Sequence, residues 1–109
     1  MAFDEGLAER VRDVLRDREE ISERKMFGGL AFMSRGHMFV GILGDTLMAR
    51  VGPDQYADAL RQPATREMDF TGKPMKGYVY VAPDGIEADS ALERWIGQCL
   101  TCARSLPPK

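Results

Sequence analysis

Between residues 25 and 51 the chain consists of short apolar runs separated by glycines, and this pattern restricts the fold more than any other. The runs KMFGG, LAFM, HMFVGIL and TLMARV are separated by short segments that include Ser34-Arg35-Gly36 and Gly44-Asp45. Short apolar runs between glycine-containing turns are typical of strands. Gly44-Asp45 suits a two-residue hairpin turn, which requires positive φ angles. The pattern therefore predicts antiparallel strands with short connections.

Three segments outside these runs are predicted to be helices. From Asp4 to about Glu20, apolar residues recur at helical spacing, and Asp4 is placed to cap the first turn. Pro53 begins a short second helix, and Pro63 ends it. Near the C-terminus, Ser90 and Glu93 have the spacing of a capping box that begins an amphipathic helix. The apolar face of this last helix is expected to consist of Leu92, Trp95, Ile96, Cys99, Leu100 and Ala103.

Two more strands are predicted between the second and third helices. Residues 67–70 and 76–81 alternate polar and apolar side chains, and Thr71-Gly72-Lys73-Pro74 between them is typical of a turn. The resulting order is helix, three or four strands, helix, two strands, helix, without the βαβ rhythm of parallel sheets. We therefore expect an α+β fold of two layers, with an antiparallel sheet covered on one face by helices. A chain of 109 residues is expected to form one domain, residues 1–109.

Composition limits where the chain is expected to act. It is 44% hydrophobic and 29% charged, as globular proteins are. No apolar run approaches the roughly 20 residues that cross a bilayer, and the N-terminal residues lack the pattern of a signal peptide. The only two cysteines, Cys99 and Cys102, are too close in sequence to join distant parts of the fold. We therefore expect no membrane insertion or export, and a location in the reducing cytoplasm.

Charge is distributed unevenly along the chain. The net charge is −2, but residues 1–23 hold eight acidic and four basic side chains, and residues 24–76 hold eight basic and five acidic ones. This distribution indicates a weakly basic surface in the middle of the chain. The excess of basic over acidic side chains in residues 24–76 is far smaller than that of a dedicated nucleic-acid-binding domain. We expect no direct binding of nucleic acid by this chain.

No set of residues has the pattern of an active site. Cys99 and Cys102 have the spacing of half a zinc site or of a redox dithiol, but zinc takes four ligands and the only histidine, His37, lies in a distant predicted hairpin. The two thiols also lie near the C-terminal end of the predicted helix, where the helix dipole opposes a thiolate. His37 is interpreted as an edge histidine and not as a catalytic base. We assign no catalytic residue, metal or cofactor.

Methionines and basic residues are concentrated in the same middle region. Methionine is typical both of irregular cores and of adaptable binding surfaces, and core filling is the favoured interpretation. The internal methionines are Met26, Met33, Met38, Met48, Met68 and Met75. The basic residues Lys25, Arg50, Lys73 and Lys76 have two interpretations that the sequence leaves open. They either converge at one end of the sheet and contact an acidic partner or are separate solvated charges.

Four blocks of sequence, in order, resemble the N-terminal domain of the TfoX/Sxy family, and the likeness covers nearly the whole chain. The blocks are KMFGG at 25–29, RVGP at 50–53, MDFTGKPMKGY at 68–78 and SLPPK at 105–109. The resemblance implies a two-layer domain in the order helix, three strands, helix, two strands, helix, similar to secretion-chaperone-like folds. It also implies kinship with regulators of natural competence genes in bacteria, thought to act with the cyclic-AMP receptor protein. Those regulators carry a second, C-terminal domain that is not in this sequence.

Three functions follow as hypotheses. The leading one is a non-enzymatic regulatory module that binds protein, either transcription machinery or a regulator of the cyclic-AMP receptor type. Its expected contact residues are Lys25, Arg50, Lys73, Lys76 and Tyr78. The second is a homodimeric chaperone-like scaffold that uses an exposed sheet edge or helix face. The third is a small metal- or thiol-dependent enzyme built on Cys99, Cys102 and His37.

Overall fold

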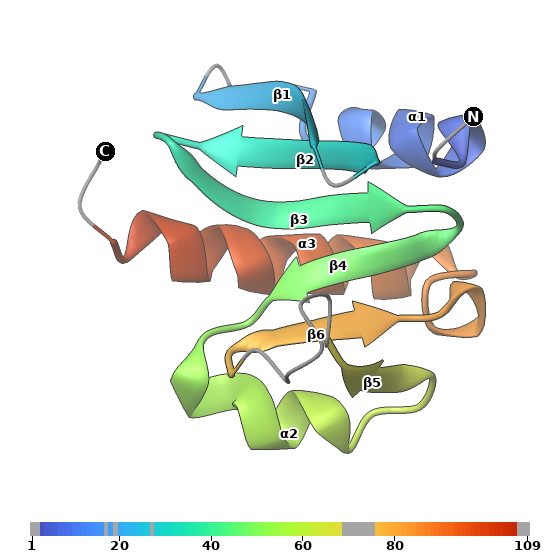
Figure 1. The fold of residues 1–109 in the computed structure, drawn as a ribbon, viewed down its shortest axis with the longest axis vertical. Coiled ribbons are helices and arrows are strands. Elements are labelled where there is room, and N and C mark those ends of the chain that lie inside the picture. Colours follow the sequence, from blue (N-terminus) through green and yellow to red (C-terminus); the bar gives the residue numbers. More distant parts are fainter. Residues whose placement is uncertain (1–2, 17, 19, 27, 69–75, 107–109) are drawn as a thin grey trace.

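The computed structural model describes residues 3–16, 18, 20–26, 28–68 and 76–106, and it is an α+β domain (Figure 1). All strand pairs are antiparallel, and the six strands lie in the order β1-β2-β3-β4-β6-β5. The elements are α1 (Glu5–Val14), β1 (Ile21–Met26), β2 (Gly29–Ser34), β3 (His37–Leu43), β4 (Thr46–Arg50), a 3₁₀ turn (Pro53–Gln55), α2 (Tyr56–Leu60), β5 (Thr65–Glu67), β6 (Tyr78–Val81), a second 3₁₀ turn (Pro83–Gly85) and α3 (Asp89–Arg104). The predicted fold class is confirmed. Four strands precede α2, one more than the family resemblance implied.

Two-residue turns join β2 to β3 and β3 to β4. Arg35 and Gly36 have φ angles of 51° and 88°, and Gly44 has a φ of 61°. Positive φ at these positions lets the turn follow the right-handed twist of the strands. The glycine pattern of the sequence therefore predicted both turns correctly.

One face of the sheet packs against α1 and α3. Alternate side chains of the strands point to this face, and with the buried side chains of the two helices they form the main core. All six residues predicted for the apolar face of α3 are buried. Figure 1 shows α3 crossing behind β3 and β4. Within the described part of the chain, no helix is long and apolar enough to cross a membrane.

The first helix is shorter than the sequence pattern suggested. It ends at Val14, whereas we expected it to continue to about Glu20. The amide of Arg18 bonds to the carbonyl of Leu15, and the amide of Ile21 bonds to that of Arg18, so tight turns replace the helical pattern. These turns bring the chain back into β1 beside α1. The predicted cap is confirmed, because the Asp4 carboxylate accepts hydrogen bonds from the amides of Gly6 and Leu7.

Two other predicted boundaries were wrong. The strand expected at 67–70 begins earlier, as β5, Thr65–Glu67, because this segment pairs with the far end of β6, where Thr65 faces Val81; residues 69 and 70 lie outside the described residues. The capping box of Ser90 and Glu93 does not form, because α3 already begins at Asp89. Arg10 of α1 contacts this start, since its guanidinium donates to the carbonyl of Ile86 at 2.7 Å and to the Asp89 carboxylate at 3.2 Å.

An ion pair joins α1 to the edge of the sheet. The Arg12 guanidinium donates two hydrogen bonds of 2.8 Å to the Glu23 carboxylate of β1 and a third, of 2.6 Å, to Glu9. The hydrogen bonds from Arg12 hold the pKa of Glu23 below its usual range. This ion pair therefore links α1 directly to β1, the strand that follows it.

Two glycine substitutions should have opposite effects on stability. A Cβ at Gly29 would lie 2.1 Å from the backbone carbonyl oxygen of Ile42, so Gly29→Ala should lower the free energy of unfolding by about 2 kcal/mol. A Cβ at Gly97, inside α3, meets no atom within 4 Å, so Gly97→Ala should raise it by about 0.5–1 kcal/mol. Urea unfolding of both variants measures this. Equal effects of the two would contradict the described packing of β2 on β3.

The Arg12–Glu23 pair should make part of the stability depend on pH. Because the folded pKa of Glu23 is lowered, its contribution is present above the unfolded pKa of about 4.3 and is lost as the pH falls through the folded value. Glu23→Gln should therefore cost about 0.5 kcal/mol at pH 7, a small value because the pair is partly exposed, and nothing in strong acid. Urea unfolding at a series of pH values measures the difference. Glu87→Gln, at an exposed site away from Arg12, is the control, and a cost independent of pH would contradict the assignment.

Candidate functional site

The face of the sheet opposite α1 and α3, here called the second sheet face, is the candidate site. Cross-strand partners share a face of a sheet, so the strand register shows which side chains belong to it. One row of partners crosses all six strands from β5 to β1. The row consists of Arg66, Tyr80, Met48, Gly41, Ala31 and Arg24. It has an arginine at each end and small or apolar residues between them.

A second, smaller core lies in the middle of this face. Met48 has no exposed surface, Met68 is 2% exposed and Tyr80 is 4% exposed, and the partly buried Leu43 and Tyr78 pack against them. Gly41 makes room for this cluster, because a Cβ there would come within 2.5 Å of the Met48 methyl carbon. The expectation that methionines fill a core is therefore confirmed for Met48 and Met68. Met33 and Met38, which are cross-strand partners, are only half-buried.

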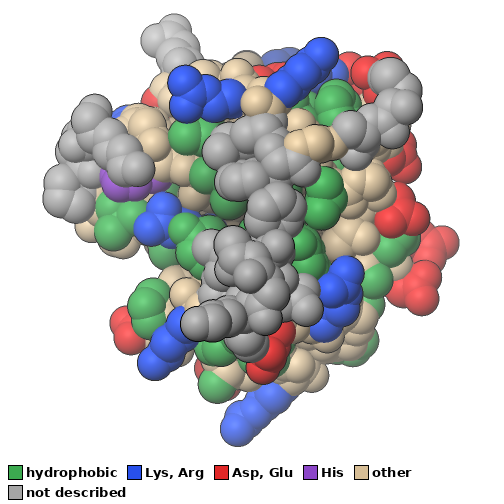
Figure 2. All heavy atoms as spheres, viewed as in Figure 1, with side chains coloured by type: hydrophobic (Ala, Val, Ile, Leu, Met, Phe, Trp, Pro, Cys, Tyr) green, Lys and Arg blue, Asp and Glu red, His purple; other side chains and the backbone are tan. Residues whose placement is uncertain are grey.

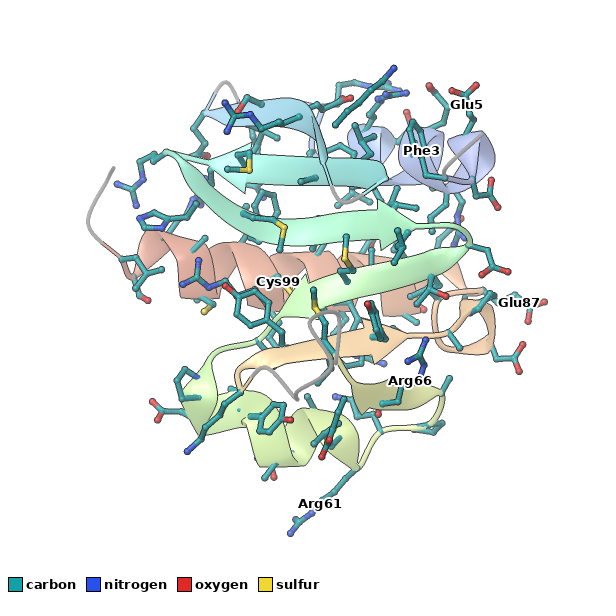
Figure 3. All side chains as sticks on the ribbon, in the orientation of Figure 1. Phe3, Glu5, Arg61, Arg66, Glu87 and Cys99 are labelled. Atoms are coloured by element: carbon teal, nitrogen blue, oxygen red, sulfur yellow. The ribbon has the colours of Figure 1, made fainter. Side chains whose placement is uncertain are left out.

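Two arginines of this face lie over tyrosine rings. The Arg50 guanidinium carbon is 5.5 Å from the ring centroid of its cross-strand partner Tyr78, and that of Arg66 is 4.4 Å from the centroid of its partner Tyr80. Arg50 also donates to the carbonyl of Met38 at 3.4 Å. A guanidinium on an aromatic face is held in position by its attraction to the ring. Figure 3 labels Arg66 beside β5 and β6.

The charges that the described strands place on this face have one sign. Among the described strand residues whose side chains the register places there, the charged ones are Arg24, Arg50 and Arg66. Figure 2, which views this face, shows Lys and Arg side chains among hydrophobic ones, with Asp and Glu side chains mainly along the right edge of the view. The second sheet face thus combines apolar contact area with fixed positive charge.

The structure brings together only part of the predicted contact set. Arg50 and Tyr78 are in direct contact, and Lys76 is exposed in the turn just before β6. Lys25 is the cross-strand partner of Leu30, a residue of the main core, so it belongs to the helix side of the sheet and is three strands away from Arg50. Lys73 lies outside the described residues.

Sequence reasoning missed Arg24, Arg66, Met33 and Met38 as members of one surface. Each lies on a different strand, and only the strand register places them on the same face. The cross-strand pairing of Arg66 with Tyr80 was hidden because β5 was expected farther along the chain. A usable sequence signal was the i, i+2 spacing of Met48 and Arg50, and of Tyr78 and Tyr80, within short strands.

The two cysteines lie on the helix side of the sheet. Burial raises the pKa of the Cys99 thiol, the nearby Cys102 adds to this, and a hydrogen bond from the Arg50 backbone amide acts in the opposite direction. Cys102 is half-buried and lines a groove of about 950 Å³ between α2 and α3, whose rim carries both signs of charge, including Asp58 and Arg94. In the part of the chain that the structure describes, no group of three potential metal ligands occurs.

These observations define a small two-layer α+β domain whose candidate site is a sheet surface. The family model of the TfoX N-terminal domain matches residues 13–103, so the chain belongs to the TfoX N-terminal domain family. The suspected resemblance is thereby confirmed. Searches of curated proteins and of solved structures found no match.

The two thiols should differ sharply in reactivity. The thiolate is the reactive form, and burial disfavours it at Cys99 but leaves Cys102 partly accessible. We expect iodoacetamide to modify Cys102 in the native protein and to modify both thiols in denaturant, as peptide mass spectrometry would show. Cys102→Ser should remove the labelling of the native protein. Equal labelling of Cys99 under native conditions would contradict the described burial.

Proposed function

We propose that this chain is a non-enzymatic regulatory module that acts by binding another protein through its second sheet face. The observation that carries the proposal is the Arg50–Tyr78 pair beside the half-buried Met33 and Met38. Arginine, tyrosine and methionine are enriched where proteins bind each other. Because its ring contact already holds the Arg50 guanidinium, binding would cost little further side-chain entropy.

Membership of the TfoX N-terminal domain family supports a regulatory role. We propose a partner in the bacterial transcription apparatus, either the transcription machinery itself or a regulator of the cyclic-AMP receptor type. The cytoplasm is the proposed place of action, and the free thiols of Cys99 and Cys102 suit a reducing compartment.

The two other hypotheses have less support from the described residues. A homodimeric scaffold that paired through β1, at one edge of the sheet, would bring together the consecutive charged residues Glu23, Arg24 and Lys25, which hinder such pairing. A thiol-dependent enzyme would need an activated cysteine, and burial raises the pKa of Cys99.

A charge-reversal variant tests the proposed function. Immobilised wild-type protein should capture a partner from a bacterial lysate, and the double variant Arg50→Glu, Lys76→Glu should lose most of it, because it places one negative charge on the second sheet face and another in the turn just before β6. The double variant Arg16→Glu, Arg61→Glu makes the same charge change at exposed residues outside the strands and should capture as the wild type does. Quantitative mass spectrometry of the captured proteins is the measurement. Identical captured sets for all three proteins would count against this face.

A further inference from the structure

We propose that the second sheet face recognises an extended acidic segment of its partner, with an aliphatic side chain between two carboxylates. This inference rests on the proposed function and adds the chemistry of the partner. The pattern is Asp or Glu at position i, an aliphatic residue at i+2, and Asp or Glu at i+4. Three features of the face lead to it.

The first feature is the placement of positive charge. Arg24 on β1 and Arg50 on β4 are separated by three strand spacings of about 4.8 Å and by an offset of two residues along the strands, about 16 Å in all. Arg24 is exposed and Arg50 is half-buried, so both can meet a carboxylate from outside. Guanidinium groups bind carboxylates in a planar, two-bonded geometry, which gives specificity for acids over amides.

The second feature is the apolar strip between these arginines. Met33 on β2 and Met38 on β3 are cross-strand partners, and each is half-buried. Methionine side chains adapt to the shape of an apolar partner group. An aliphatic side chain of the partner that packed on this strip would complete the burial of the two methionines.

The third feature is the match between the strip and an extended peptide. In an extended chain, side chains at i, i+2 and i+4 point to the same side, and four residues span about 13–14 Å. A segment with its aliphatic side chain on Met33 and Met38 would therefore place one carboxylate beside Arg50 and the other within reach of the long side chain of Arg24, which lies two residues away along its strand. The distance between the two arginines thus sets the spacing of the two acids.

Single-stranded nucleic acid is the less suitable occupant. Binding of bases on a sheet depends on aromatic ring faces that are free to stack. On the described second sheet face, Arg50 covers a face of Tyr78, Arg66 covers a face of Tyr80, and Tyr80 is only 4% exposed. The net charge of −2 also opposes a polyanion at long range. A peptide with two carboxylates meets the same arginines with far less repulsion.

Titration of isotope-labelled full-length chain with synthetic peptides, followed by NMR, tests the inference. The probe contains Glu-Thr-Leu-Thr-Glu between short Gly-Ser flanks. Its matched controls replace both Glu by Gln, or Leu by Ser. The acidic probe should shift amide signals of β1 to β4, and each control peptide should bind at least about fivefold more weakly. Arg50→Glu should weaken the acidic probe at least about tenfold, whereas Arg61→Glu, at an exposed residue next to α2, should not.

Three results would overturn the inference. They are the absence of shifts with the acidic probe, equal binding of the Gln peptide, and tighter binding of a single-stranded oligothymidine to the same strands. A lysate partner that the Arg50→Glu, Lys76→Glu variant loses, but whose binding site lacks the acidic pattern, would leave the proposed function standing and overturn only this inference. Circular dichroism of the Arg50→Glu variant shows whether it has folded, and the peptide comparison on the wild type does not depend on that variant.

Discussion

The register of the β3–β4–β6 ladder is the constraint on which the rest of the structure depends. Within β4, Leu47 and Ala49 belong to the main core beneath the helices, while Met48 and Arg50 belong to the second sheet face. A slip of one residue in this ladder would exchange the two sets, and Arg50 would be buried under α3. The interior and the candidate site are therefore fixed by the same backbone hydrogen bonds.

Local signals in the sequence were sufficient for the types and order of the elements. The hairpin turns at Arg35-Gly36 and at Gly44, the cap at Asp4 and the buried side of α3 each depend on residues close together in the chain, so their patterns could be recognised. Boundaries that involve contacts between distant parts of the chain could not be recognised in this way. The start of α3 is contacted by Arg10 of α1, which lies far away in the sequence, and no local pattern reports that contact.

The candidate site could be predicted only in part, for the same physical reason. Arg50 and Tyr78 were on the expected contact list, and their meeting follows from their pairing across β4 and β6. Lys25 and Arg24 are adjacent basic residues in one strand, yet they lie on opposite faces of the sheet. Composition cannot separate such neighbours, because only the register decides which of them faces the methionines.

Arg50 connects the two sides of the sheet. Its backbone pairs with Tyr78 in the β4–β6 ladder and lies near the buried Cys99 of α3, while its side chain lies on Tyr78 and donates to the Met38 carbonyl (Figure 3 labels Cys99). A residue held at both its backbone and its side chain has little freedom left to lose. The neighbouring Met48 and Tyr80 are buried, and their packing supports the exposed side chains of this face. A partner should therefore meet a preformed surface, with small changes in side-chain conformation and little movement of the strands.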